Sequence, residues 1–174
     1  MQANRSDAWL NAMFESCSDL MIRMTQLPQP VIAQVHGIAT AAGCQLTSMC
    51  DLAVAASDAK FALPGVNVGL FCSTPAVGVA RNIGRKRVME MLLLGEPITA
   101  ETALEWGLVN RVVPADRLEA ETRHLAERIA SKSAAVIAMG KKAFYQQMDK
   151  NLSGAYAMTG DTMACNMQLA DNQE

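Results

Sequence analysis

The sequence predicts an α/β fold that continues into a helical carboxyl-terminal region. The apolar run 31–35 is followed, after Gly37, by small residues, which is typical of a buried strand that leads into a helix. Short apolar runs at 52–55 and 60–63 indicate two further strands. From Arg85 onward, charged residues alternate with apolar ones at helical spacing. The chain has 174 residues, 51% of them apolar, which is enough for one proper hydrophobic core.

The first helix is predicted to begin at Ser6 and Asp7, because Ser and Asp are favoured at the amino ends of helices. Pro28 is expected to end it. Apolar residues recur at helical spacing between these points, so we expect one face of the helix to be buried. The residues of this face are Leu10, Met13, Phe14, Cys17, Leu20, Met21 and Met24.

The middle of the chain is predicted to alternate strands with short helices. A helix of small residues follows Gly37 directly and ends near Met49. The further elements expected here are the strands 52–55 and 60–63, a turn at Pro64 and Gly65, an extended segment at 66–70, and a helix from Thr74 or Pro75 to about Gly84.

The rest of the chain is predicted to be mainly helical. The expected elements are a helix that Gly95 ends, a short helix capped by Thr99 and closed by Gly107, a strand at 108–113 that Pro114 stops, and helices at 116–131, 133–148 and 152–170. We interpret residues 1–114 as a partial α/β core and residues 115–174 as a helical region attached to it.

Composition excludes some kinds of partner. A formal net charge of −2 without a dense basic run argues against nucleic acid. Two charge-free windows, 24–50 and 61–80, are interrupted by proline and polar residues, so we expect no membrane span. Charged residues make up only 18% of the chain, which predicts that an oligomer covers part of its surface. Five scattered cysteines predict reduced thiols in a cytosol-like compartment.

Three segments, 30–51, 61–69 and 95–114, resemble the signatures of the crotonase (enoyl-CoA hydratase/isomerase) superfamily, in the same order and at similar spacing. Together they extend over most of the chain between residues 30 and 114. The strings 39–45 and 64–75 are also similar to those of one particular group in this superfamily.

The resemblance implies a spiral of ββα units whose carboxyl-terminal helices build a homotrimer or a dimer of trimers. It also implies an acyl-CoA thioester as the ligand, so that coenzyme A enters as part of the substrate and no separate cofactor is expected. Members of the superfamily normally begin with several more strands and end with a further helix. We therefore expect an N-terminally truncated member, cytoplasmic by default and mitochondrial if a transit peptide precedes the sequence.

Ala42 is the residue on which the predicted chemistry depends. The resemblance implies that its N–H binds the negative charge that develops on a thioester carbonyl oxygen, with Gly43 keeping the helix start open beside it. The alternative is that the small residues only let this helix pack closely on a strand.

The two glutamates with which hydratases move protons fall, by resemblance, on Gln45 and Gly65. An amide has no useful basicity and glycine has no side chain, so efficient hydration is not expected. Gln45 is equally consistent with a ligand contact and with a polar side chain satisfied on a helix face. By resemblance, Pro64, Cys72 and Ser73 border the acyl group.

Other chemistry-bearing side chains are expected to be structural. Asp51 is interpreted as a turn residue, and His36 as a core histidine rather than a base. His124 lies on an exposed-looking helix, and with only two distant histidines we expect no metal site.

The leading hypothesis is a superfamily member that binds an acyl-CoA thioester through a backbone oxyanion site and lacks efficient hydratase activity. One alternative is an active enzyme of another outcome, such as an isomerase, a thioester hydrolase or a decarboxylase. The other is a non-catalytic oligomerisation subunit.

Overall fold

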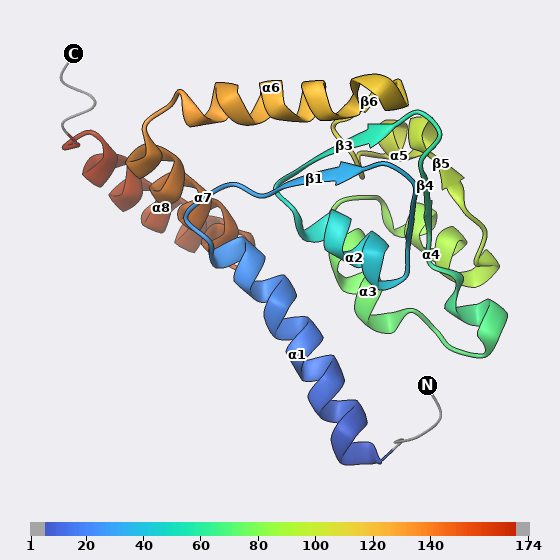
Figure 1. The fold of residues 1–174 in the computed structure, drawn as a ribbon. Helices are drawn as coiled ribbons and strands as arrows, with labels where there is room; N and C mark the ends of the chain where they lie inside the picture. The colour runs from blue at the N-terminus through green and yellow to red at the C-terminus, as the bar shows by residue number, and fades with distance from the viewer. Residues whose placement is uncertain (1–5, 170–174) are drawn as a thin grey trace.

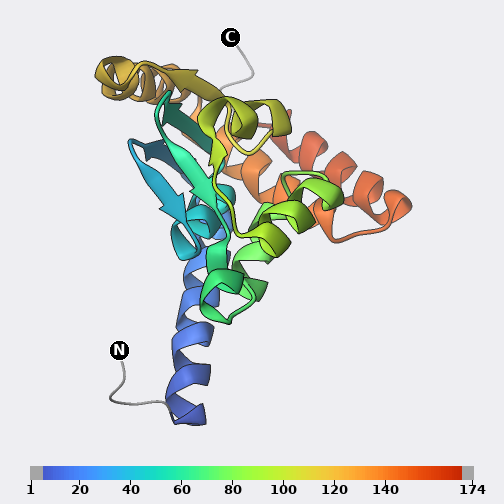
Figure 2. The ribbon, with the colours of Figure 1, turned by 90° about the vertical axis from the view of Figure 1, so that its right-hand side faces the viewer.

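A computed structural model describes residues 6–169 of the chain. Its first element, α1 (Asp7–Gln26), extends away from the rest of the molecule (Figures 1 and 2). The Ser6 hydroxyl accepts a hydrogen bond from the Trp9 N–H at 3.3 Å, which confirms the predicted start. Of the predicted buried face, only Met21 and Met24 are buried, and Leu10 and Cys17 are half-buried. The prediction is wrong for Met13, Phe14 and Leu20, which are exposed because α1 extends away from the body of the molecule.

Two small sheets form the centre of the fold. In the first, β1 (Ile32–Val35), β3 (Leu52–Ala56) and β6 (Arg111–Val113) are parallel, in the order β1-β3-β6. In the second, β2 (Ile38–Thr40), β4 (Lys60–Ala62) and β5 (Ile98–Thr99) lie in the order β2-β4-β5, with β2 parallel and β5 antiparallel to β4.

Strand β2 corrects the prediction that a helix follows Gly37 directly. After Gly37 the chain enters the second sheet, because Ile38 to Thr40 pair in parallel register with Lys60 to Ala62. Only then does α2 (Ala42–Met49) begin. The pairing partner lies more than 20 residues further along the chain, so the local pattern could not reveal this strand.

The segment after β4 is also not extended as predicted. Residues Pro64–Val68 form the 3₁₀ helix η1, which ends at Gly69 with a φ of 76°. The Leu70 N–H donates to the Gly65 carbonyl at 2.9 Å, which folds this loop back on itself. The next helix, α3 (Ser73–Val79), is shorter than predicted.

The later elements follow the predicted order. Helix α4 (Arg85–Leu94) ends at Gly95, and α5 (Ala100–Trp106) begins at Thr99 and ends at Gly107. Strand β6 occupies only the end of the predicted strand 108–113, and the 3₁₀ helix η2 (Ala115–Arg117) follows it. The last helices are α6 (Leu118–Ala130), α7 (Ala134–Met148) and α8 (Leu152–Asn166). The predicted end of the last helix, at residue 170, lies outside the described residues.

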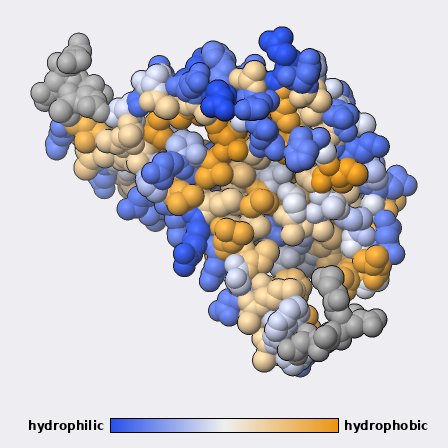
Figure 3. Space-filling model, viewed as in Figure 1, coloured by the Kyte–Doolittle hydropathy of each residue, from blue (hydrophilic) through white to orange (hydrophobic). Residues whose placement is uncertain are grey.

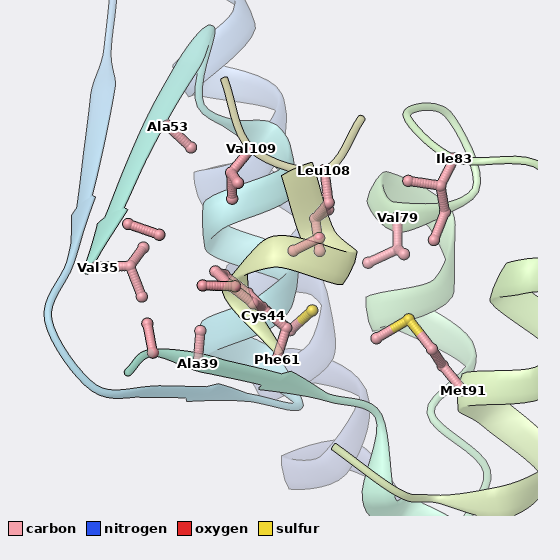
Figure 4. Packing of buried hydrophobic residues seen from close by; sticks show 14 of the residues in the cluster. Val35, Ala39, Cys44, Ala53, Phe61, Val79, Ile83, Met91, Leu108 and Val109 are labelled. Carbon is pink, nitrogen blue, oxygen red and sulfur yellow. The ribbon is translucent and has the colours of Figure 1, made fainter. Parts of the chain in front are cut away.

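The core lies where the sheets meet α2, α3, α4 and α5 (Figure 4). The largest fully buried side chains belong to Phe61, Leu63, Met91, Val54, Val79 and Cys44. Much of the remaining core is alanine, which brings β3 close to the helices. This packing fixes α2 against the rest of the α/β part. Over residues 6–169, no helix has the length and apolar character needed to cross a membrane.

Candidate functional site

The amino end of α2 is built on an unusual turn. Ala41 has φ 48° and ψ −113°, and it is the one non-glycine residue with a positive φ among residues 6–169. The Ala41 N–H donates to the Ala62 carbonyl at 3.0 Å, which ties this turn to the end of β4. Such a conformation costs about 1 to 3 kcal/mol and persists only where the surroundings impose it.

The strained turn leaves free donors at the start of the helix. No hydrogen bond from the N–H of Ala42, Gly43 or Cys44 occurs within the described part of the chain, and no side chain caps the helix. Ala42 and Gly43 are both exposed. A ligand with negative charge on an oxygen could therefore reach these N–H groups, which the helix dipole also favours.

The Ala41→Gly variant is expected to raise the free energy of unfolding by about 1 kcal/mol. Glycine adopts this φ and ψ without strain. The backbone strain that it removes exceeds the extra entropic cost of about 0.5 to 1 kcal/mol for ordering glycine on folding. Urea denaturation measures the change. The control Ala157→Gly, in the exposed middle of α8, should instead lose about 1 kcal/mol. A loss of similar size at both positions would contradict the assigned strain.

Gln45 lies one helical turn beyond Ala42. Its side chain is buried, with 5% exposed, and its Oε1 accepts a hydrogen bond from the Cys17 Sγ of α1 at 4.0 Å. The sequence predicted Gln45 as a site residue but did not connect Cys17 with it. The only available signal was the position of Cys17 on the apolar stripe of α1.

Gly65 is held in a space that has no room for a side chain. A Cβ at this position would lie 2.8 Å from the Leu70 carbonyl oxygen and 2.9 Å from the Cys72 Sγ. The Gly65 N–H donates to the same sulfur at 3.3 Å. The buried Cys72 thiol and the Leu70 carbonyl therefore occupy the place where a residue with a side chain would project.

The neighbours of Gly65 differ in their exposure. Pro64 begins η1 and is half-buried, whereas Ser73 is exposed and its hydroxyl donates only to the Phe71 carbonyl, at 3.4 Å. No basic side chain is hydrogen-bonded to Ser73 in residues 6–169, so the structure gives this hydroxyl no means of activation.

Helix packing brings these segments together. Helix α3 lies against α2 at Gly78, where an added Cβ would come within 2.4 Å of the Ser48 hydroxyl. The pairing of β2 with β4 joins the start of α2 to the segment that leads into Pro64. The α2–α3 contact and the β2–β4 pairing thus connect the two segments, 42–45 and 64–73, that contain the predicted site residues.

The Cys44 side chain is fully buried behind this site. Burial, with a further contribution from the nearby Cys72 thiol, raises the pKa of the Cys44 thiol to about 12. The side chain has no exposed surface and lies among the core residues (Figure 4). Cys44 is therefore a neutral core residue at physiological pH, not a nucleophile.

Stability is expected to fall with rising pH above about 9. In the unfolded chain the Cys44 thiol ionises near pH 9, whereas in the folded chain it stays protonated up to about pH 12. The protonated Cys44 thiol therefore contributes its full stabilisation below pH 9. Above pH 9 the free energy of unfolding falls by about 1.4 kcal/mol per pH unit because of this one group. Urea denaturation from pH 8 to 10.5 with reductant measures the slope. The Cys44→Ala variant should lose stability less steeply, and equal slopes in both proteins would contradict the assignment.

Asp51 forms a buried polar cluster rather than a simple turn. Its carboxylate accepts hydrogen bonds from the Lys141 ammonium at 2.6 Å, the Tyr145 hydroxyl at 2.9 Å and the Val31 N–H at 2.7 Å. Lys141 also donates to the carbonyls of Met24 and Gln29. Burial, and then the bond to Asp51, raise the pKa of Tyr145. The sequence did not predict the roles of Lys141 and Tyr145.

A cavity of about 690 Å³ lies beside this cluster, between α6, α7 and the start of β3. None of the predicted site residues lines it, and all three ammonium protons of Lys141 already have acceptors.

His36 is exposed at the end of β1, so its interpretation as a core histidine is wrong. His124 is exposed on α6, and within the part of the chain that the structure describes no three His, Cys, Asp or Glu side chains cluster as metal ligands would.

Comparison with known proteins assigns the chain to a family. The sequence profile of the enoyl-CoA hydratase/isomerase family matches residues 2–173. Enoyl-CoA hydratase domain-containing protein 3, mitochondrial, from mouse (Mus musculus) and from Homo sapiens, is 50% identical over 162 residues, which are 93% of this chain and 54% of each relative. The chain thus spans about half the length of these curated relatives.

Comparison with solved structures supports the same family. An enoyl-CoA hydratase from Mycobacterium smegmatis is 51% identical and superposes with a TM-score of 0.98 over 100% of this chain and 68% of its own. The crystal structure of human enoyl-CoA hydratase domain-containing protein 3 is 51% identical, with a TM-score of 0.90 over 92% of this chain and 64% of its own. The fold is therefore crotonase-like, and the chain belongs to the enoyl-CoA hydratase/isomerase family, with marked similarity to the domain-containing protein 3 group that the strings 39–45 and 64–75 had indicated.

Proposed function

We propose that this chain binds the thioester carbonyl of an acyl-CoA at the amino end of α2 and has little hydratase activity. The observation that carries the proposal is the strained turn at Ala41, which leaves the N–H groups of Ala42 and Gly43 free and exposed. Donors fixed in this way stabilise charge on a carbonyl oxygen, because they need no reorganisation when the charge develops. Coenzyme A enters with the ligand, and the proposal requires no other cofactor.

The weak hydratase activity follows from the side chains near these donors. Hydration needs one group to take a proton from water and another to deliver a proton to carbon, and each typically contributes a factor of about 10² to 10⁴. Gln45 carries an amide, and the space beside Gly65 is filled by Cys72 and Leu70. Neither position offers a carboxylate that could act as the acid or the base.

Crotonyl-CoA tests both parts of this proposal. We expect it to raise the melting temperature of the protein without being converted to the hydrated product. Turnover near the rate of ordinary hydratases would contradict the proposal, and so would the absence of any stabilisation. Analysis of the products after long incubation would also detect the other reactions that an enolate-stabilising site can support, namely isomerisation, thioester hydrolysis and decarboxylation.

Removing the Ala42 donor itself gives a sharper test. Proline is tolerated at the first position of a helix and has no N–H, so an Ala42→Pro change deletes this one donor. The change is best made together with Ala41→Gly, because proline restricts the residue before it. We expect the Ala41→Gly/Ala42→Pro protein to fold but to bind butyryl-CoA about tenfold more weakly than the Ala41→Gly protein, by calorimetry. Equal affinity in the two proteins would contradict the role of Ala42.

Assembly is a second candidate function. Large apolar side chains stay exposed on α1, α7 and α8, and apolar patches of this kind appear on the face shown in Figure 3. They include Trp9 at 45%, Phe144 at 56%, Leu152 at 74% and Tyr156 at 73% exposure. Monomers seldom expose so much apolar surface, which supports an assembly of several copies. We propose a homotrimer or a dimer of trimers, which is the assembly that the resemblance implies. Light scattering after gel filtration measures the mass, and a monomer at micromolar concentration would contradict this candidate.

Free thiols support a reducing compartment. Cys17, Cys44, Cys50, Cys72 and Cys165 are all unbridged. We propose the cytoplasm or, as in the names of the mouse and human relatives, the mitochondrion.

A further inference from the structure

The cavity of about 690 Å³ between α6, α7 and the start of β3 is separate from the proposed thioester site. In Figure 1, α6 lies above α7 and β1, and on the same face Figure 3 shows hydrophilic side chains along the top and apolar ones below them. No residue of the segments 42–45 or 64–73 lines the cavity. Its volume falls within the range of about 300 to 1,000 Å³ that is usual for small-molecule sites, so it is large enough for a ligand.

The walls of this cavity are mainly apolar. Half-buried side chains from β3, α6 and α7 form much of them, namely Leu52, Leu125, Ile129 and Ile137. Gly140 of α7 also lines the cavity, and a Cβ at this position would meet no atom within 4 Å. The missing side chain therefore leaves the space between the walls open. An alkyl chain in this space would remove apolar surface from water on both partners, which favours binding.

The polar groups at the buried end of the cavity are already satisfied. Lys141 and Asp51 pair at 2.6 Å, and their side chains are only 6% and 17% exposed. Asp51 is the one acidic side chain that the described part of the chain brings to the lining, and Lys141 compensates its charge. All three Lys141 protons have acceptors, and the Tyr145 hydroxyl donates to Asp51. This end therefore offers no free donor to an anion.

The mouth of the cavity carries positive charge that is not compensated. Arg128 and Lys132, at and just beyond the last turn of α6, line the cavity and are exposed. Neither side chain has a hydrogen-bond or ion-pair partner among residues 6–169. Arg111, which also lines the cavity, is paired with Glu121. The free cationic donors thus lie at the open end, next to apolar walls.

We propose that this cavity binds an alkyl carboxylate of medium chain length, with its carboxylate at Arg128 and Lys132 and its chain along the apolar walls. A guanidinium presents parallel N–H donors that match the two oxygens of a carboxylate, and an ammonium adds a second positive charge. The proposal does not depend on the function proposed above, because the two sites share no residue.

The test titrates the full chain with decanoate by isothermal titration calorimetry. We expect a dissociation constant on the order of 10 to 100 µM, which is typical of a ligand of this size. Each methylene removed from the chain should weaken binding about fourfold, because less apolar surface is buried. Decanol keeps the chain but lacks the charge, and it should bind about tenfold more weakly. Equal affinity for decanoate and decanol would contradict a site for an anion.

A side chain at Gly140 tests where the alkyl chain lies. Gly140→Leu should fold, because its Cβ meets no atom within 4 Å, and it should bind decanoate at least about tenfold more weakly because it fills the cavity. The matched control is Gly160→Leu, at an equally open glycine of α8 that does not line the cavity. This control should keep the wild-type affinity. Unchanged affinity in a folded Gly140→Leu protein would overturn the proposal.

Variants of the two cations test the head group. The Arg128→Gln/Lys132→Gln protein should bind decanoate about tenfold more weakly and bind decanol as the wild type does. The control Lys142→Gln removes an exposed cation of α7 that does not line the cavity, and it should change neither affinity. Cations also stabilise the carboxyl end of a helix. If that is their whole role, the double variant loses stability but keeps its affinity for decanoate, and the proposal is overturned.

The Ala41→Gly/Ala42→Pro protein separates this inference from the proposed function. It should bind decanoate as tightly as the Ala41→Gly protein does, although its affinity for butyryl-CoA is expected to be lower. If it loses decanoate as well, the carboxylate binds at the start of α2 and the inference is wrong. If the wild type binds butyryl-CoA but not decanoate, the inference fails while the proposed function stands.

Discussion

Replacing Lys141 by methionine is expected to lower the free energy of unfolding by about 3 to 5 kcal/mol. The side chain of Lys141 is only 6% exposed, and its removal leaves the Asp51 carboxylate, itself only 17% exposed, without its cation. Breaking a buried ion pair on one side has a large effect because the remaining charge stays desolvated. Urea denaturation followed by circular dichroism measures the change, which is a substantial part of the 5 to 15 kcal/mol typical of a domain.

Two further variants check this reason. The Asp51→Asn/Lys141→Met protein removes both charges and should recover part of the loss. The Arg123→Ala variant breaks the exposed pair with Glu119 and should lose less than about 1 kcal/mol. A small loss in Lys141→Met, close to that of Arg123→Ala, would show that the cluster around Asp51 does not hold α7 on the strands.

Introducing glutamate at position 65 is expected to destabilise the protein by about 3 kcal/mol without restoring hydration. The new Cβ would lie 2.8 Å from the Leu70 carbonyl oxygen, so the backbone of this loop must move. In the Gln45→Glu/Gly65→Glu protein, which carries both carboxylates, crotonyl-CoA hydration should stay at background. Urea denaturation and a spectroscopic hydration assay measure the two effects.

The control for this prediction is a glycine with space around it. A Cβ at Gly140 in α7 would meet no atom within 4 Å, so Gly140→Ala should raise stability slightly. Adding Cys72→Ala to Gly65→Glu removes one of the two close contacts and should recover only part of the loss. Rapid hydration by a stable double-glutamate protein would show that the loop accommodates the side chain after all.

Local sequence patterns predicted most helices and strands, because their signals lie within a few residues. Ser6, Thr99 and Gly107 mark helix ends by capping chemistry, and the structure places those ends where the sequence did. Strand β2 was missed because its identity depends on pairing with β4. The fold of 66–70 was also missed, because it depends on the hydrogen bond from Leu70 back to Gly65.

The sequence alone determined the family and the small residues at the start of α2, since each of these is a property of residue type at a position. That Gln45 and Gly65 stand where hydratases carry glutamates is what the resemblance implies, and it stays a prediction. Only the tertiary structure showed that Ala41 is strained, that Cys72 fills the space beside Gly65 and that Cys17 contacts Gln45. It also joined Lys141 to Asp51, 90 residues away. Contacts between distant segments depend on how helices and strands pack, and no local spacing encodes that packing.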